Sequence, residues 1–514
     1  MEKLYSTRLR ASCALSDYRT ACLDGLDTSD LSGSPELIGR MFEELSSIDE
    51  LEKMLKESRS VVEKTMTMLT SYSPLLPDEV WAHIFRMVCN TTPCDLQGMG
   101  SNQKIISRGY YLESLSHVCS RWRSIIIELP CLWNHIDILH CHTSSERFFA
   151  RGLVFISRSR NLPIHLHVAS FGNSTPESDS KLDEFCAHLF GRIHTLEVIC
   201  PGDRLDNSSQ AVVQACLSSC QPGVLQQLSL AHFCGVSDRS IGQLSRSQEL
   251  IEDVMEFVKI LSLSGYYFPH LRKTWNSLIE LSLCAPKDDC AYYLRQSDIS
   301  QLLASCPQLS ALHFGTGISD NNIIRSIPPI PLTDLEVLDL RWSGHRNYGA
   351  LFSLISPTKR PLRVLLRYRF TNSSPLNSSR TRHFFLHSNI IHLSMKGPTG
   401  AVWILRLLAL LPQLRVLTLI GSTLDSRSST IPPNTSSFSR LSLLEKLRLV
   451  HCSISIYQLR NIAQVDPIKT LIVQDCNIGN YEISGEDLVG IAPEIHFIDS
   501  SGSNSRIQDW DENF

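Results

Sequence analysis

The stretch LEKLRLVHCSI, residues 444–454, decides the fold. It has apolar residues at its first, fourth, sixth and eleventh positions and a cysteine at its ninth, and IKTLIVQDCNI repeats this spacing at residues 468–478. Because side chains alternate between the two faces of a strand, Leu447 and Leu449 share one face, while Lys446 and Arg448 share the other. The stretch therefore predicts a strand with one apolar and one polar face.

A shorter frame, L-x-x-L-x-L with other apolar residues allowed, returns along most of the chain. Helix-like pieces such as SQLLASCPQL, residues 300–309, lie between copies. One copy carries little information, because any leucine-rich strand produces it, but a sustained series indicates a repeated strand–helix unit. After an early copy at residue 193, copies begin at residues 225, 258, 278, 309, 335, 362, 390, 414, 444, 468 and 495.

Such a unit cannot bury its apolar side alone, so neighbouring units stack into a solenoid with one continuous core. The two extended copies resemble leucine-rich repeats, with Cys452 and Cys476 where a small inward-facing residue belongs. We therefore predict an α/β fold in which residues 138–500 form a leucine-rich-repeat solenoid, that is, a curved, mostly parallel sheet with outer helices. A polar tail follows at residues 501–514.

Residues 73–137 carry a different pattern, that of short helices. In LLPDEVWAHIF, residues 75–85, Pro77 suits the first helical position, and the two acidic residues after it suit the positive end of the helix dipole. A second helix is predicted in YLESLSHVCSRWRSIIIELP, residues 111–130, where apolar residues recur at steps of three and four until Pro130 ends it. The next residues, CLWNHIDI, alternate like a strand.

These helical residues resemble an F-box, whose consensus runs L-P-x-E-[IV]-x-x-x-I-F, then L-x-x-V-C-x-x-W-R, then x-x-P-x-L-W. An upstream helix and trailing repeats around such a motif resemble the large fungal F-box families. One departure is an insertion at about residues 91–109, where the family has a brief turn. The matching residues are Leu76, Pro77, Glu79, Val80, Ile84, Phe85, Leu115, Val118, Cys119, Trp122, Arg123, Pro130, Leu132 and Trp133.

The resemblance implies a substrate-recruiting adaptor. Its F-box would dock on the Skp-family subunit of a cullin–RING ubiquitin ligase by placing apolar side chains into a groove of that subunit, and its repeats would bind a protein substrate. Some of the matching residues must instead form the core of the helical domain, with Trp122 and Trp133 as the first candidates. The residues carried over as docking, or as supporting it, are Leu76, Pro77, Val80, Ile84, Phe85, Leu115, Val118 and Trp122.

The N-terminal residues are less regular. Residues 1–45 lack clear periodicity and are predicted to be flexible. Residues 46–72 predict an amphipathic helix that either lies on the next domain or forms a short coiled coil. Ser47 and Glu50 have the spacing of a capping box, which would begin this helix.

The composition of the chain limits the classes of molecule that it is expected to bind. The net charge is −4, so the chain has no overall basic field for nucleic acid or an anionic membrane. No signal segment and no long apolar run occur. Seventeen cysteines, an odd number without a C-x-x-C pair, fit free thiols in a reducing compartment. We expect an intracellular protein, cytoplasmic and/or nuclear, with protein partners.

Catalytic and metal motifs are weak. No P-loop, G-x-G-x-x-G, H-E-x-x-H or G-x-S-x-G occurs, so neither an enzyme nor a cofactor is predicted. NHIDILHCHTSS, residues 134–145, gathers three histidines and a cysteine, but H-C-H lacks zinc-finger spacing. IHLHV, residues 164–168, places two histidines on one side of another predicted strand. Structural roles are predicted for both groups, and no metal site.

Substrate contacts are expected from the residues between the leucines, which point outward from the sheet. Together they predict a wall of mixed charge with a basic spot near its C-terminal end. An alternative function is a non-ligase leucine-rich-repeat scaffold whose F-box-like helices only cap the solenoid. The candidate substrate-binding residues are Glu280, His313, Asp339, Arg341, Lys446 and Arg448.

Overall fold

The chain divides into two compact units, residues 1–81 and 82–514. None of its described helices combines the length and the apolar content that crossing a membrane requires. The computed structural model describes residues 2–24, 35–70, 76–91, 108–140, 145–170, 176–200, 207–232, 248–266, 273–285, 293–319, 328–340, 348–367, 379–397, 401–424, 444–465, 467–478, 481–482 and 485–498.

The first unit holds two long helices, α1 (Glu2–Asp24) and α2 (Pro35–Thr70). These helices were not predicted over residues 1–45, and α2 begins at residue 35 instead of at the predicted residue 46. Pro35 begins α2 because its fixed φ suits a first helical position. Ser47 is therefore inside the helix, where its hydroxyl donates a hydrogen bond to the Glu43 carbonyl oxygen at 3.1 Å instead of capping a helix start.

The described residues of the F-box-like segment form three helices and a 3₁₀ turn, namely α3 (Asp78–Thr91), α4 (Arg108–Ser116), α5 (Ser120–Glu128) and η3 (Pro130–Leu132). The single helix predicted over residues 111–130 is wrong, because the chain breaks it at Cys119. This residue is extended, and its Sγ accepts a hydrogen bond from the Trp122 backbone N–H, which caps α5. Residues 92–107, which hold most of the predicted insertion, lie outside the described residues.

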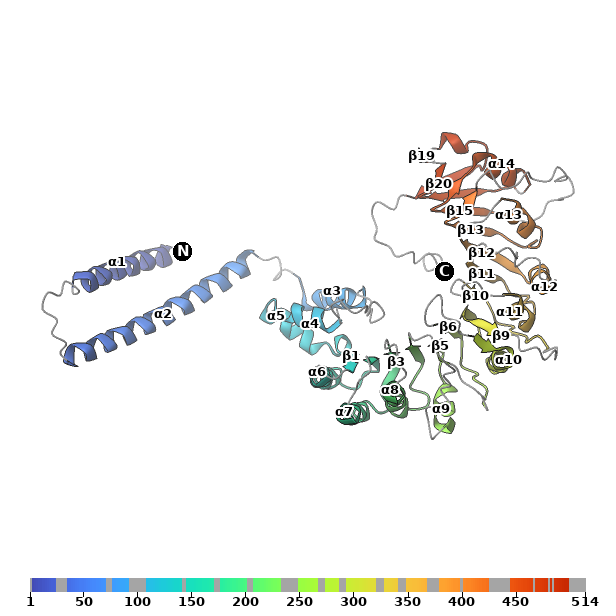
Figure 1. Ribbon diagram of the computed structural model, residues 1–514. Coiled ribbons are helices and arrows are strands. Elements are labelled where there is room, and N and C mark those ends of the chain that lie inside the picture. Colours follow the sequence, from blue (N-terminus) through green and yellow to red (C-terminus); the bar gives the residue numbers. More distant parts are fainter. Residues whose placement is uncertain are drawn as a thin grey trace. The chain divides into compact units, whose positions relative to one another are not determined.

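A parallel sheet runs through the second unit with its strands in chain order (Figure 1). Two smaller sheets consist of β14 (Thr423–Leu424), β16 (Ser453–Ile454), β18 (Asn477–Ile478) and β19 (Tyr481–Glu482), and of β7 (Tyr293–Arg295) and β9 (Gly317–Ser319). The 14 described strands of the main sheet are β1 (His135–His140), β2 (Ile164–Ser170), β3 (Ile193–Cys200), β4 (Gln227–His232), β5 (Ile260–Ser264), β6 (Glu280–Cys284), β8 (Ala311–Gly315), β10 (Val337–Leu340), β11 (Leu362–Arg367), β12 (Ile390–Lys396), β13 (Val416–Ile420), β15 (Lys446–Val450), β17 (Thr470–Gln474) and β20 (Glu494–Ile498).

Helices connect most of these strands and lie along one side of the sheet (Figure 1). The predicted α/β solenoid architecture is confirmed by this arrangement. The connecting helices are α6 (Ser145–Arg158), α7 (Pro176–Ala187), α8 (Asn207–Ser218), α9 (Gln248–Met255), α10 (Gln296–Ala304), α11 (Tyr348–Leu354), α12 (Ser379–His387), α13 (Ala401–Leu408), α14 (Ile456–Val465) and the 3₁₀ turn η7 (Glu486–Leu488).

The sheet has a buried face and an open face. On β1, Ile138 points toward α6, since a Cβ added at Gly152 of that helix would lie 3.2 Å from Ile138 Cδ1. The residues that alternate with Ile138 point the other way, and we call the side of the sheet on which they lie the open face. Cys452 and Cys476 point inward as predicted, and both are buried.

Strand register shows which of the predicted frames are in phase. Leu338 of β10 pairs with Val364 of β11, so Val364 faces inward, and the frame placed at residue 362 is out of phase by one. Leu471 of β17 pairs with Ile495 of β20, so the last frame begins three residues before its predicted start. LRVLLR contains three leucines, and only pairing with a neighbouring strand decides which of them face the core.

Candidate functional site

The core of the F-box-like helices is built from large apolar side chains. The Phe85 ring meets the Trp122 ring edge-on, with centroids 5.1 Å apart, and Phe85 is only 1% exposed. Trp133 is also buried, and its Nε1–H donates a hydrogen bond to the Ile126 carbonyl oxygen at 2.8 Å. Phe85 therefore holds the helical core, as Trp133 does, and is not available to a partner.

Other apolar side chains of this segment reach solvent. Val118, in the turn before α5, is 60% exposed, and Val80 on α3 is 40% exposed. Pro77 is exposed as well, whereas Leu76, Ile84, Leu115 and Trp122 are half-buried.

Met87 and Ile127 are exposed apolar residues that were absent from the predicted docking set. Met87 could have been found from the spacing of α3, because it lies seven residues after Val80 on the same helical face. Ile127 could not, because the apolar run at residues 125–127 does not show which of its members leaves the core.

The helical segment continues directly into the start of the sheet. Arg151 Nε of α6 lies 2.7 Å from Glu113 Oε1 of α4. The Trp133 ring packs edge-on against Phe155 of α6 at 4.8 Å between centroids, and the Arg158 guanidinium lies 4.4 Å from the Trp133 ring centroid. These contacts join α4, α5 and η3 to the first strand–helix unit.

The structure brings three predicted substrate-binding residues together on β6, β8 and β10. His313 Nε2 lies 3.5 Å from Glu280 Oε1, and His313 Nδ1 lies 3.3 Å from Asp339 Oδ2. Asp339 was predicted to be an accessible outward position, and this is wrong: the residue is 1% exposed. The side chain occupies an open-face register position but lies beneath its neighbours. Arg341 lies outside the described residues.

A set of basic side chains occupies the open face of β11, β12 and β15. Two of its members, Lys446 and Arg448, were predicted from the sequence, and strand register adds the other three, because β12 and β13 connect β11 to β15. No acidic residue stands at the described open-face positions of β11, β12, β13 and β15. We define the basic patch as Arg363, Arg367, Lys396, Lys446 and Arg448.

His392 lies within this patch, and burial and the neighbouring positive charges affect its pKa. Its Nε2 is 3.3 Å from Thr418 Oγ1. Burial and then the charges of Arg363, Arg448 and Lys446 disfavour the imidazolium form and lower the pKa of His392 to about 4. Burial is the larger cause of this shift, and the neighbouring positive charges act in the same direction.

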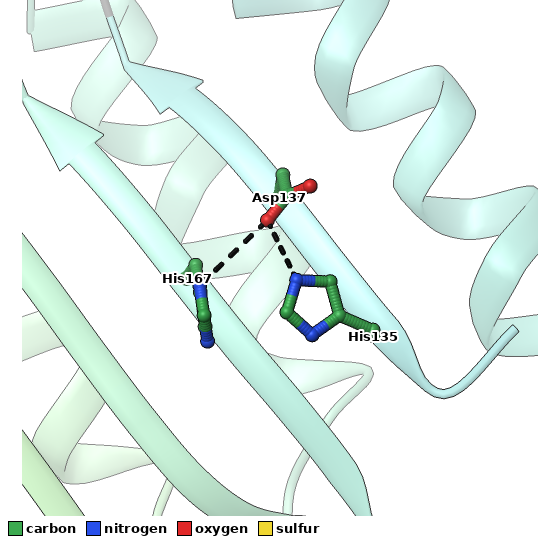
Figure 2. A group of neighbouring side chains, drawn as sticks. All are labelled: His135, Asp137 and His167. Atoms are coloured by element: carbon green, nitrogen blue, oxygen red, sulfur yellow. Dashed lines mark hydrogen bonds and ion pairs between the residues drawn. The ribbon is translucent and has the colours of Figure 1, made fainter. Parts of the chain in front are cut away.

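A second histidine group lies at the opposite end of the sheet, on β1 and β2 (Figure 2). His135 Nε2 is 3.1 Å from Asp137 Oδ1, and His167 Nδ1 is 3.8 Å from the same oxygen. The two imidazole rings meet edge-on with centroids 4.3 Å apart. Glu197 Oε2 of β3 lies 3.5 Å from His167 Nδ1. We call His135, Asp137 and His167 the histidine–aspartate cluster.

Sequence reasoning missed this cluster because it grouped residues by nearness along the chain. The histidine at position 140 points to the opposite face of β1 and is fully buried, with its Nε2 3.0 Å from Ser178 Oγ and 3.3 Å from Asp179 Oδ1. Cys141 and His142 lie outside the described residues. Parallel pairing instead places Asp137 opposite His167, a residue 30 positions away.

Comparison with known proteins identifies one part of the chain. A search of the curated proteins finds no match. A family model described as F-box-like matches residues 74–139, a span that holds α3, α4, α5, η3 and nearly all of β1.

Proposed function

We propose that this chain is the substrate-recruiting adaptor of a Skp–cullin–F-box ubiquitin ligase. The observation that carries the proposal is the F-box-like match at residues 74–139, within which Val80 and Val118 expose apolar side chains. Val80 lies on α3 and Val118 lies in the turn before α5, and both stand at positions that the family resemblance assigns to docking. The partner expected here is the Skp-family subunit, since binding it is the role that the family resemblance implies.

Docking would follow helix-in-groove recognition. Val80, Ile84 and Val88 stand four residues apart on α3, so they form one stripe along that helix. Ile84 is half-buried and joins the stripe to the core, whereas Val80 and Val88 are exposed. Val118 is 60% exposed in the turn before α5 and is a further candidate docking residue.

The open face of the sheet would bind the substrate. The basic patch presents five cationic side chains without an acidic residue at the described open-face positions of the same strands. We expect it to select an acidic segment, because charge complementarity determines which partner is admitted and how fast it associates. The chain would then act by proximity, by holding that substrate near the ubiquitin carrier of the ligase.

Co-purification with the Skp-family subunit tests this function. Val80→Asp combined with Val118→Asp places two charges on the docking surface and is expected to weaken binding at least about 100-fold, since an unpaired charge in an apolar interface costs several kcal/mol. Val154→Asp is the matched control, because Val154 is 44% exposed on α6, outside the F-box-like helices. Wild-type protein that is folded and fails to bind the subunit would contradict the proposal, as would equal loss of binding in the control.

A second candidate function is a repeat scaffold whose F-box-like helices cap the sheet. The contacts of Glu113 with Arg151 and of Trp133 with Phe155 favour it, because both join this segment to α6 of the first strand–helix unit. Capping and docking would use different side chains, so substitutions at the docking residues can distinguish the two functions. A scaffold predicts that Val80→Asp with Val118→Asp leaves all partners bound, whereas an adaptor predicts loss of the Skp-family subunit alone.

A further inference from the structure

We propose that the histidine–aspartate cluster on β1 and β2 binds a divalent first-row transition metal, with zinc as the expected ion. His135 Nε2, Asp137 Oδ1 and His167 Nδ1 would be the ligand atoms. The site is independent of the F-box docking surface and of the basic patch. It therefore goes beyond the adaptor function and stands or falls separately from it.

The two nitrogen–oxygen distances are close to those of a metal site. The ligand-type atoms of the three residues all lie within 4.8 Å of one another, and Asp137 Oδ1 is 3.1 Å from one imidazole nitrogen and 3.8 Å from the other. Ligand atoms held about 2.0–2.2 Å from a tetrahedral zinc ion lie about 3.3–3.6 Å apart. Shifts of a few tenths of an ångström therefore bring both nitrogen–oxygen distances to the values that a shared ion requires.

The residue types select the class of ion. Two imidazole nitrogens and one carboxylate oxygen suit zinc and its first-row neighbours, whereas calcium and magnesium prefer oxygen ligands throughout. The Glu197 carboxylate, 3.5 Å from His167 Nδ1, adds a second negative charge beside the cation. Binding uses the neutral imidazoles and the carboxylate, and any proton on them is released to solvent.

The backbone holds these ligands in place. Asp137 is the cross-strand partner of His167, and His167 is the partner of Glu197, so three parallel strands present them in one row. His135, Asp137 and His167 are each at most 9% exposed, which limits their rotamers and excludes most water. A metal at this point would join β1, the first strand in the sheet order, to β2.

Metal titration of the chelator-treated full chain tests the site. Zinc is titrated against a chromophoric chelator, and cobalt is used as an optical probe, because the chain has many thiols that could also bind metal. We expect one equivalent of cobalt that shows no thiolate charge-transfer band. We also expect zinc to raise the melting temperature of the wild type.

Asp137→Asn and, separately, His167→Asn remove one ligand while preserving side-chain size closely. Each is expected to lower zinc affinity at least about 100-fold, since losing only an outer partner of a ligand already costs about 10–100-fold. His165→Gln is the matched control, because His165 pairs with His135 across β1 and β2 but is outside the cluster, and it should bind zinc within about threefold of wild type. Folding of each metal-free variant is checked by circular dichroism.

Two results would overturn the proposal. One is that cobalt either does not bind to the folded, chelator-treated wild-type chain or binds only with a thiolate charge-transfer band. The histidine–aspartate cluster would then be a hydrogen-bonded group without a metal. The other is zinc affinity that Asp137→Asn and His167→Asn both leave unchanged, which would place the bound metal elsewhere in the chain.

Discussion

The histidine–aspartate cluster on β1 and β2 and the basic patch on β11, β12 and β15 share one backbone geometry and differ in chemistry. Both lie on the open face of the same parallel sheet, at equivalent register positions. Near both, buried apolar side chains face inward, such as Leu196 of β3 and Leu449 of β15. The inward-facing residues therefore stabilise the same sheet in both regions. The two or three outward positions on each strand determine the chemistry of that part of the open face.

The largest expected effect tests whether the interiors of the two regions are equivalent. Leu196→Ala and Leu449→Ala each remove a side chain that is fully buried, so each should lower the free energy of unfolding by about 2–5 kcal/mol. Urea denaturation of both variants measures this, with Ser262→Ala on the open face of β5 as the control. A cost below about 1 kcal/mol for one leucine alone would show that the two ends are packed differently.

An intermediate effect distinguishes the basic patch by its pH dependence. The pKa of His392 is about 4 in the folded chain and ordinary in the unfolded chain, so the unfolded state binds the proton first as pH falls. Stability contributed by neutral His392 is therefore complete above pH 6.5 and is lost between about 6.5 and 4, by at most about 3 kcal/mol. Unfolding free energies of wild type and His392→Gln should diverge over this window, and parallel curves would contradict the prediction.

The smallest expected effect on stability is a charge reversal in the patch. Lys446 is exposed, so Lys446→Glu should change the free energy of unfolding by no more than about 0.5 kcal/mol. It should nevertheless weaken binding of an acidic peptide, measured by fluorescence anisotropy at low and high salt. Lys469→Glu is the matched control, because it changes net charge equally at an exposed residue paired with Glu445 before β17. If both variants weaken peptide binding equally, the net charge of the chain and not the basic patch determines the binding.

Much of the sheet could be predicted from the sequence, because the leucine frame shows apolar and polar residues alternating along each strand. Strand existence and the inward direction of Leu447 and Leu449 follow from that local pattern. The phase of LRVLLR did not follow, because Leu365 and Leu366 are adjacent and only pairing with β10 distinguishes them. The break at Cys119 was missed for a related reason: apolar spacing continues across two helices as it would through one.

The candidate sites were predicted less completely, because they depend on strand register. Glu280, His313 and Asp339 were identified individually, but their ion-pair chain and the burial of Asp339 arise from neighbours on other strands. Asp137 and His167 meet only through parallel pairing across a connecting helix. A local pattern shows which face a side chain is on, and it does not show which distant residue lies beside it.

The agreement between strand order and chain order has an evolutionary consequence. Each strand of the main sheet pairs only with the described strands that precede and follow it, so duplicating one strand–helix unit would insert a single strand, about 4.8 Å wide, without changing any other pairing. Gene-level gain or loss of a unit could thus move the basic patch and the histidine–aspartate cluster closer together or further apart while leaving each intact. The distance between these two groups would then be inherited separately from the residues that compose each of them.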